Sequence, residues 1–208
     1  MSEVDEAAVA TTGSTTVGGS TTGGDRGSRR VAPWVAGGLA LVLAALFVML
    51  LVNRGTPADS ANSPLLGNPA PDVQGRYEDG TTFDLSRRKG SWVVLNFFSH
   101  DCVPCIVEHP ALIEFVDTQR ALGTQGAEFY TVVQNSSRQQ VDEFFARYGG
   151  DWPIVYDDEF AFQIEFGVAQ VPETWVLDPN GTVRRRYIST VDAAELNSAL
   201  QAMREGRL

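Results

Sequence analysis

The chain contains, at residues 92–98, the stretch Trp92-Val93-Val94-Leu95-Asn96-Phe97-Phe98, and shortly after it the tetrad Cys102-Val103-Pro104-Cys105. The first stretch is almost continuously apolar and of strand length, which is typical of a central strand covered on both faces. The second places two thiols at C-x-x-C spacing where that strand gives way to a helix, and the chain has no other cysteine. The combination predicts a thiol–disulfide exchange site.

The two cysteines are expected to differ because they lie at different places on the helix. Cys102 comes at the helix N-terminus, where unpaired backbone N–H groups and the helix dipole favour a thiolate, so we expect it to be the exposed nucleophile. Pro104 suits the first turn, where no backbone N–H is needed. Cys105, one turn further on, is expected to be the buried thiol that resolves the mixed disulfide. The alternative is two structural cysteines that happen to be close.

Strand and helix patterns alternate around this site. Strands are predicted over residues 73–77, 82–85, 128–133, 154–156, 174–177 and 183–188. Helices are predicted over residues 103–122 and 160–166. Two more are predicted, one opened by a capping box at 137–140 and one opened by Asp192. Pro110 is expected to kink the first helix. The acidic run 157–159 is interpreted as a solvated turn. Strands that alternate with helices imply an α/β fold with a mixed sheet covered on both faces.

Charge and composition divide the chain into parts. Residues 1–55 hold four acidic residues and four arginines, so the whole net charge of −10 lies on residues 56–208. An acidic domain does not suit nucleic acid, whose phosphates are bound by Lys and Arg, so we expect no nucleic-acid partner. Residues 1–30 are dominated by Ser, Thr, Gly and Ala, contain no aromatic residue, and are predicted to be a disordered cytoplasmic tail.

Residues 31–52 carry no charged side chain and are long enough to cross a bilayer core of about 30 Å as a transmembrane helix. Arg26, Arg29 and Arg30 precede this stretch, whereas only Arg54 follows it closely. The positive-inside rule therefore predicts a single-pass signal anchor in the cell membrane, with the N-terminus cytoplasmic and the C-terminal part extracytoplasmic. The alternative is a cleaved signal peptide. Residues 53–66 are predicted to be a linker and 67–208 a compact domain.

Three segments match motifs of one known family. They are residues 96–110, which surround the cysteines, Gly67-Asn68-Pro69-Ala70-Pro71-Asp72, and Gly167-Val168-Ala169-Gln170-Val171-Pro172-Glu173-Thr174. Together they resemble the thioredoxin superfamily, and most of all its membrane-anchored TlpA/ResA/CcmG branch, over about residues 67–205. The resemblance implies a thioredoxin-like fold with an N-terminal β-hairpin and a central αβ insertion. It also implies a cis Pro172 beside the cysteines, with the backbone of Val171 turned toward the substrate chain.

The resemblance implies a functional glutamate at Glu108, one helical turn after Cys105. A carboxylate there opposes thiolate formation and can relay a proton. The other interpretation of Glu108 is a solvated helix charge. We take Cys102, Cys105 and Glu108 as the candidate catalytic residues.

Asp101 departs from the family pattern, which has Trp before the first cysteine. An acid there removes an apolar docking surface and is expected to raise the pKa of Cys102. Val103 and Pro104 stand where strongly oxidising relatives have a histidine. Both departures favour a reductant, whereas a charged His100 would favour the opposite. The candidate substrate-binding residues are Asp101, Val103, Pro104, Val171 and Pro172.

These patterns predict an extracytoplasmic thiol–disulfide oxidoreductase that reduces protein disulfides. The resemblance implies an integral-membrane thiol reductase as electron donor. It also implies apocytochrome c as substrate, and Glu173 after Pro172 is similar to the cytochrome-maturation members. We expect no cofactor beyond the redox-active disulfide Cys102–Cys105.

Two other functions fit the residues. His100 and His109 bracket the cysteines as H-x-C-x-x-C-x-x-x-H, and these four side chains could hold zinc or copper, as in a thioredoxin-fold metallochaperone. The simpler interpretation is that both are surface histidines and that no metal is bound. The remaining alternative is a thioredoxin-like binding domain whose cysteines do not turn over.

Overall fold

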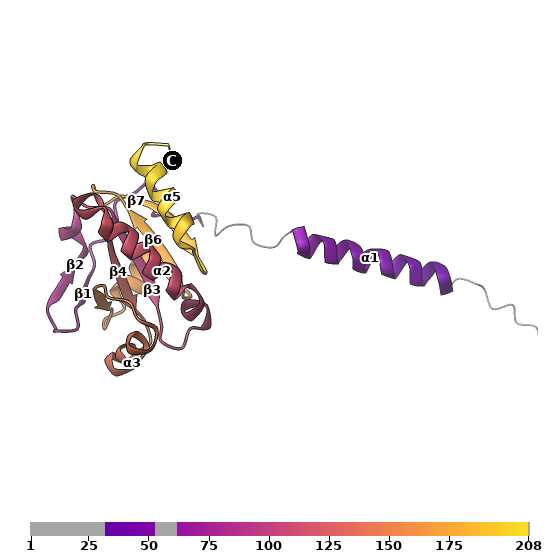
Figure 1. Ribbon diagram of the computed structural model, residues 1–208, viewed down its shortest axis with the longest axis horizontal. Helices are drawn as coiled ribbons and strands as arrows, with labels where there is room; N and C mark the ends of the chain where they lie inside the picture. Colours follow the sequence, from indigo (N-terminus) through magenta and orange to yellow (C-terminus); the bar gives the residue numbers. More distant parts are fainter. Residues whose placement is uncertain (1–31, 53–61, 208) are drawn as a thin grey trace, which may run out of the picture. The chain divides into compact units, whose positions relative to one another are not determined.

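The computed structural model describes residues 32–52 and 62–207, with the side chains of the first stretch described over 36–49 (Figure 1). The chain forms two units, one containing helix α1 (Ala32–Val52) and the other containing every further element. Within the described residues, no helix is both long and apolar enough to cross a membrane. The predicted tail, the flanking arginines and the linker as far as residue 61 lie outside the described residues. The membrane anchor therefore stays a prediction.

One mixed sheet of seven strands forms the centre of the larger unit, in the order β2-β1-β5-β4-β3-β6-β7 (Figure 1). Strands β3, β4 and β5 run parallel, whereas the flanking hairpins β1–β2 and β6–β7 are antiparallel. The strands are β1 (Gln74–Arg76), β2 (Thr82–Asp84), β3 (Val93–Phe98), β4 (Glu128–Val133), β5 (Ile154–Tyr156), β6 (Glu173–Leu177) and β7 (Val183–Ile188). The mixed sheet with an N-terminal hairpin is as predicted.

Helices cover both faces of this sheet. They are α2 (Val103–Ala121), α3 (Arg138–Tyr148), α4 (Ala161–Phe166) and α5 (Ala193–Arg204), with short 3-10 turns at Leu85–Arg88 and Gly123–Gln125. Helices α2 and α5 lie side by side on one face (Figure 1), where Phe115 and Leu200 share a buried apolar cluster. Helix α4 packs on the opposite face through Phe162 and Phe166.

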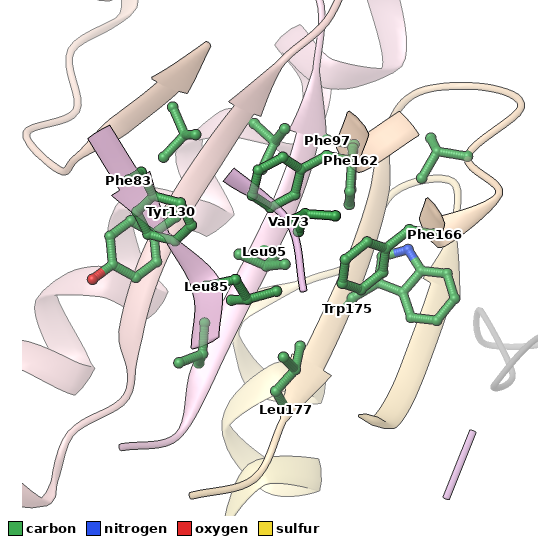
Figure 2. Packing of buried hydrophobic residues seen from close by; sticks show 14 of the residues in the cluster. Val73, Phe83, Leu85, Leu95, Phe97, Tyr130, Phe162, Phe166, Trp175 and Leu177 are labelled. Atoms are coloured by element: carbon green, nitrogen blue, oxygen red, sulfur yellow. The ribbon is translucent and has the colours of Figure 1, made fainter. Parts of the chain in front are cut away.

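The core on the α4 face is rich in aromatic rings. Figure 2 shows Phe97 and Leu95 of β3 in the middle of this cluster, with Trp175 from β6 on one side and Tyr130 from β4 on the other. Every residue of β3 is buried, because helices cover both faces of the central strand. The almost continuous apolar run of this strand is explained by that position.

Local signals in the sequence mark several element ends correctly. The capping box forms at Ser137, whose Oγ accepts from Gln140 N–H while the Gln140 side chain accepts from Ser137 N–H (2.9 Å). Helix α2 begins at Val103 and continues past Pro110 as one helix; the kink stays a prediction. The prediction of a solvated turn at residues 157–159 is wrong for Asp157. This carboxylate is buried and accepts from two backbone N–H groups at the start of α4.

Candidate active site

The two cysteines form a disulfide at the start of α2, with their Cα atoms 5.2 Å apart. Cys102 is the N-cap residue of this helix, and the backbone N–H of Cys105 donates to its Sγ (3.1 Å). Cys102 is partly exposed, whereas Cys105 is only 2% exposed. The first sulfur is therefore the one that an incoming thiol or disulfide can reach, and it lies where a helix N-terminus favours negative charge.

The Val171–Pro172 segment approaches this disulfide through Val171, although it is distant in the sequence. The Val171–Pro172 peptide is cis. Val171 and Cys102 both pack against one apolar cluster, which consists of Phe98, Cys105, Val133, Val141, Phe144 and Tyr156. The carbonyl of Pro172 accepts from the backbone N–H of Ser189 (3.0 Å), just after β7. The two cysteines and Val171 thus meet at one apolar cluster, and Pro172 is buried directly after Val171.

Glu108 is a buried carboxylate held by two hydrogen bonds from other elements. The side-chain amide of Asn96 on β3 donates to its Oε1 (2.8 Å), and the backbone N–H of Val191 donates to its Oε2 (3.1 Å). Burial raises the pKa of Glu108 to about 7, although both hydrogen bonds act in the opposite direction. A solvated helix charge is therefore the wrong interpretation. At neutral pH this carboxyl can both release and accept a proton.

Asn96 is a site residue that the sequence reasoning passed over. It is 1% exposed in the middle of β3, and besides Glu108 its amide donates to Thr174 Oγ1 on β6 (3.1 Å). Asn96 thus joins α2 to two strands beside the disulfide. A signal existed, because it is the one polar residue in the run 92–98.

Asp101 presents a charge to solvent next to the disulfide. Its side chain is 73% exposed, and the His100 Nδ1 lies 3.8 Å from its Oδ1. A hydrogen bond from the Ser99 hydroxyl is the main reason that the pKa of Asp101 is lowered from its usual value. Val103 and Pro104, between the cysteines, are also exposed. The structure thus groups the candidate substrate-binding residues of the C-x-x-C loop on its outer surface.

His109 is not a surface histidine, which corrects the simpler interpretation of the sequence. It is 2% exposed and its Nε2 lies 2.9 Å from the carbonyl oxygen of Gly149. Four aromatic rings surround it, those of Phe144, Phe145, Tyr148 and Trp152. Burial lowers the pKa of His109. In the part of the chain that the structure describes, no group of three His, Cys, Asp or Glu side chains is placed to hold a metal ion.

Residues 65–202 match the Redoxin family. The chain belongs to this family. Among curated proteins it is 28% identical to the thiol-disulfide oxidoreductase ResA of Geobacillus thermodenitrificans, over 80% of this chain and 92% of that protein. It is 26% identical to the thiol:disulfide interchange protein DsbE of Vibrio cholerae, over 81% of this chain and 90% of that protein. These relatives confirm the resemblance to the TlpA/ResA/CcmG branch.

The solved structures confirm the thioredoxin-like fold of this Redoxin-family protein. The thioredoxin domain of a thiol-disulfide oxidoreductase from Bacteroides vulgatus superimposes with a TM-score of 0.58 at 20% identity. The match covers 68% of this chain and 99% of that domain. With the family and the relatives together, the protein is a thiol–disulfide oxidoreductase.

Glu173, directly after Pro172, is a second buried carboxylate of this Redoxin-family site. It is 1% exposed and forms a two-point ion pair with Arg186 on β7, through Nε to Oε1 (2.8 Å) and Nη2 to Oε2 (2.9 Å). The indole N–H of Trp175 also donates to its Oε1 (2.6 Å). The residue that follows the cis-proline is therefore tied to the edge strand.

Proposed function

We propose that this oxidoreductase reduces disulfides of proteins outside the cytoplasm, while anchored to the cell membrane by the uncharged sequence stretch 31–52. The observation that carries the catalytic part is the position of Cys102. Its sulfur caps α2, is accessible, and is paired with a buried Cys105 beside a cis-proline. A nucleophile at a helix end with a resolving thiol one turn away is the arrangement that disulfide exchange needs.

The first step uses the reduced form of the protein. The Cys102 thiolate attacks one sulfur of the substrate disulfide, so the substrate S–S bond breaks and a mixed disulfide forms. The departing substrate sulfur leaves as a thiolate and takes a proton from solvent. The backbone of Val171, before Pro172, pairs with the substrate chain and aligns its disulfide with Cys102.

The second step regenerates the internal disulfide, and Glu108 takes part in it. Cys105 must lose its thiol proton before it can attack Cys102. Glu108 lies one turn along α2 and its pKa of about 7 suits it to accept that proton. The new Cys102–Cys105 bond releases the second substrate thiolate. The substrate gains two electrons and the protein loses two.

The cycle closes when a dithiol of an integral-membrane thiol reductase attacks the Cys102–Cys105 disulfide. The electrons then pass from that dithiol to this protein. The substrate that the family resemblance favours is apocytochrome c, whose haem-attachment cysteines must be reduced.

A redox titration of the full-length protein tests the direction of electron flow. We expect a potential near that of thioredoxin, about −270 mV, whereas about −120 mV would identify an oxidant and overturn the proposal. In an insulin-reduction assay, Cys102→Ser is expected to abolish activity. Cys105→Ser is expected to accumulate the mixed disulfide.

A deletion strain tests the substrate. We expect it to lose haem-bound c-type cytochromes and to regain them when a thiol reductant is added. Normal cytochromes in the deletion strain would remove apocytochrome c as the substrate.

The anchor and the side of the membrane rest on the apolar stretch 31–52 and on the excess of arginines before it. Protease treatment of intact spheroplasts is expected to digest the C-terminal domain while leaving a cytoplasmic N-terminal tag protected. Recovery of the domain in the cytosolic fraction would contradict both points.

A further inference from the structure

Helix α2 exposes a row of apolar side chains that begins at the reactive sulfur. Val103 is 68% exposed and Val107 is 69% exposed, and Pro110 on the same row is also exposed. The spacing i, i+4, i+7 places them along one face of the helix. At 1.5 Å per residue the row is about 10 Å long. We call these three residues the α2 apolar row.

This row differs from the rest of the helix. The other large apolar side chains of α2 are buried, as Leu112, Phe115 and Val116 are, or half-buried. The row faces solvent instead, beside a disulfide that must meet another polypeptide. Removing apolar surface from water lowers the free energy. A partner docked at the disulfide therefore binds more tightly if it places apolar groups on the row.

A carboxylate stands at the end of the row nearest the sulfur. Asp101 precedes Cys102, and in the described part of the chain His100 is the one basic side chain paired with it. The domain as a whole is also acidic, because the net charge of −10 lies wholly on residues 56–208. A basic group on the partner is therefore attracted to this position and an acidic group is repelled.

We propose that Asp101 and the α2 apolar row select substrate polypeptides by the residues that flank the reactive disulfide. The selected substrate carries a Lys or Arg next to its attacked cysteine and an apolar residue three or four positions away. The proposal rests on the proposed function, since it names the substrate class of the same site. Apolar packing on Val103 and Val107 supplies binding, whereas Asp101 decides which sign of charge is accepted.

The test compares cyclic synthetic peptides that each contain one disulfide. They differ in the residue next to the cysteine, which is Lys or Glu, and in a residue four positions away, which is Leu or Ser. The second-order rate at which the reduced full-length protein reduces each peptide is divided by its rate with the neutral small molecule 2-hydroxyethyl disulfide. This ratio removes effects on the intrinsic reactivity of Cys102.

The charge and the apolar contact are expected to contribute separately. We expect the wild-type protein to prefer Lys over Glu by about tenfold at low salt, less at high salt, and Leu over Ser by about fivefold. Asp101→Asn should remove most of the charge preference and keep the Leu preference. The double variant Val103→Ser/Val107→Ser should do the reverse. Leu122→Ser, at the far end of the helix and 45% exposed, is the matched control and should keep both preferences.

Each contrary result has a distinct meaning. Equal rates for all peptides, or a charge preference that survives in Asp101→Asn, would overturn this inference while leaving the exchange function intact. Failure to reduce even 2-hydroxyethyl disulfide would instead overturn the proposed function. Dimerisation of the wild-type protein that Val107→Ser abolishes, measured by sedimentation, would assign the row to a second copy of the chain and overturn the substrate role.

Discussion

Glu108, one helical turn after Cys105, and Glu173, directly after Pro172, are both buried carboxylates, but the structure gives them different partners. They are 3% and 1% exposed. Glu173 meets the guanidinium of Arg186 in a two-point ion pair. Glu108 meets only neutral donors among the described residues, the Asn96 amide and the Val191 N–H.

The difference shows what a buried acid can be used for. Burial disfavours a carboxylate unless an opposite charge offsets the lost hydration. Arg186 supplies that charge to Glu173, which therefore ties β6 to β7 beside Pro172. Neutral hydrogen bonds offset only part of the cost at Glu108, so its pKa rises to about 7. One carboxylate is suited to hold the site together and the other to exchange protons there.

The largest expected effect comes from removing the charge that Glu173 depends on. Arg186→Met should lower the free energy of unfolding by about 3–5 kcal/mol, because it leaves a buried carboxylate without its cation. Chemical denaturation measures this. The matched control is Arg120→Met, whose arginine pairs with exposed carboxylates and should cost less than about 1 kcal/mol. Equal losses of unfolding free energy in the two variants would show that the Glu173–Arg186 pair contributes no more to stability than an exposed ion pair does.

The second effect is a pH-dependent stability at Glu108. Its pKa is raised from 4.5 to about 7 in the folded state, so between those values the unfolded chain binds fewer protons than the folded protein. Stability therefore falls as pH rises through this window, by about 3 kcal/mol. Glu108→Gln does not titrate, so its stability relative to wild type should improve by that amount from about pH 4 to 8. Denaturant midpoints measured across the range would contradict this if the difference stayed constant.

The third effect concerns the rate of exchange. Glu108→Gln cannot accept the Cys105 proton, so it should slow resolution of the mixed disulfide by about 10²-fold and flatten the pH dependence near neutrality. Rapid-quench trapping of the mixed disulfide separates this step from the attack by Cys102. If Glu108→Gln resolved at the wild-type rate, Glu108 would be excluded as the proton acceptor.

The smallest effect is a shift in the titration of Glu108. Asn96→Ala removes a hydrogen bond that favours the charged form of Glu108. The midpoint in the pH dependence of the resolution rate should therefore rise by about one pH unit. Thr174→Val is the matched control, because it removes the other partner of Asn96 and leaves the bond to Glu108 in place. A similar shift in both variants would mean that the whole network, and not this bond, sets the pKa.

The sequence predicted the elements around the site closely. Strands β4, β5 and β7 have the bounds that were expected, and α2 begins at Val103. These features depend on local patterns of apolar residues and on capping residues, which act within a few positions. The family resemblance added the cis Pro172, which the structure confirms.

The surroundings of the site were harder to predict because they depend on distant partners. The sequence pattern predicts a surface position for His109, yet α3 and Trp152 cover it. The helical spacing held a signal, since His109 shares a face with Cys105 and Leu112, both buried. Glu108 and Asn96 depend on Val191 and Thr174, each more than seventy positions away.

The amino-acid sequence alone determined the reacting pair, the helix that carries it and the acidic character of the domain, because those follow from neighbouring residues and from counting charges. Only the tertiary structure decided which carboxylate meets a cation and which does not. The reason is that the sheet order β3-β6-β7 places Asn96 of β3 against Glu108 of α2, whereas it places Glu173 of β6 against Arg186 of β7. The type of a residue determines which charge it can carry. Its partners in the folded structure determine the free-energy cost of that charge when the residue is buried.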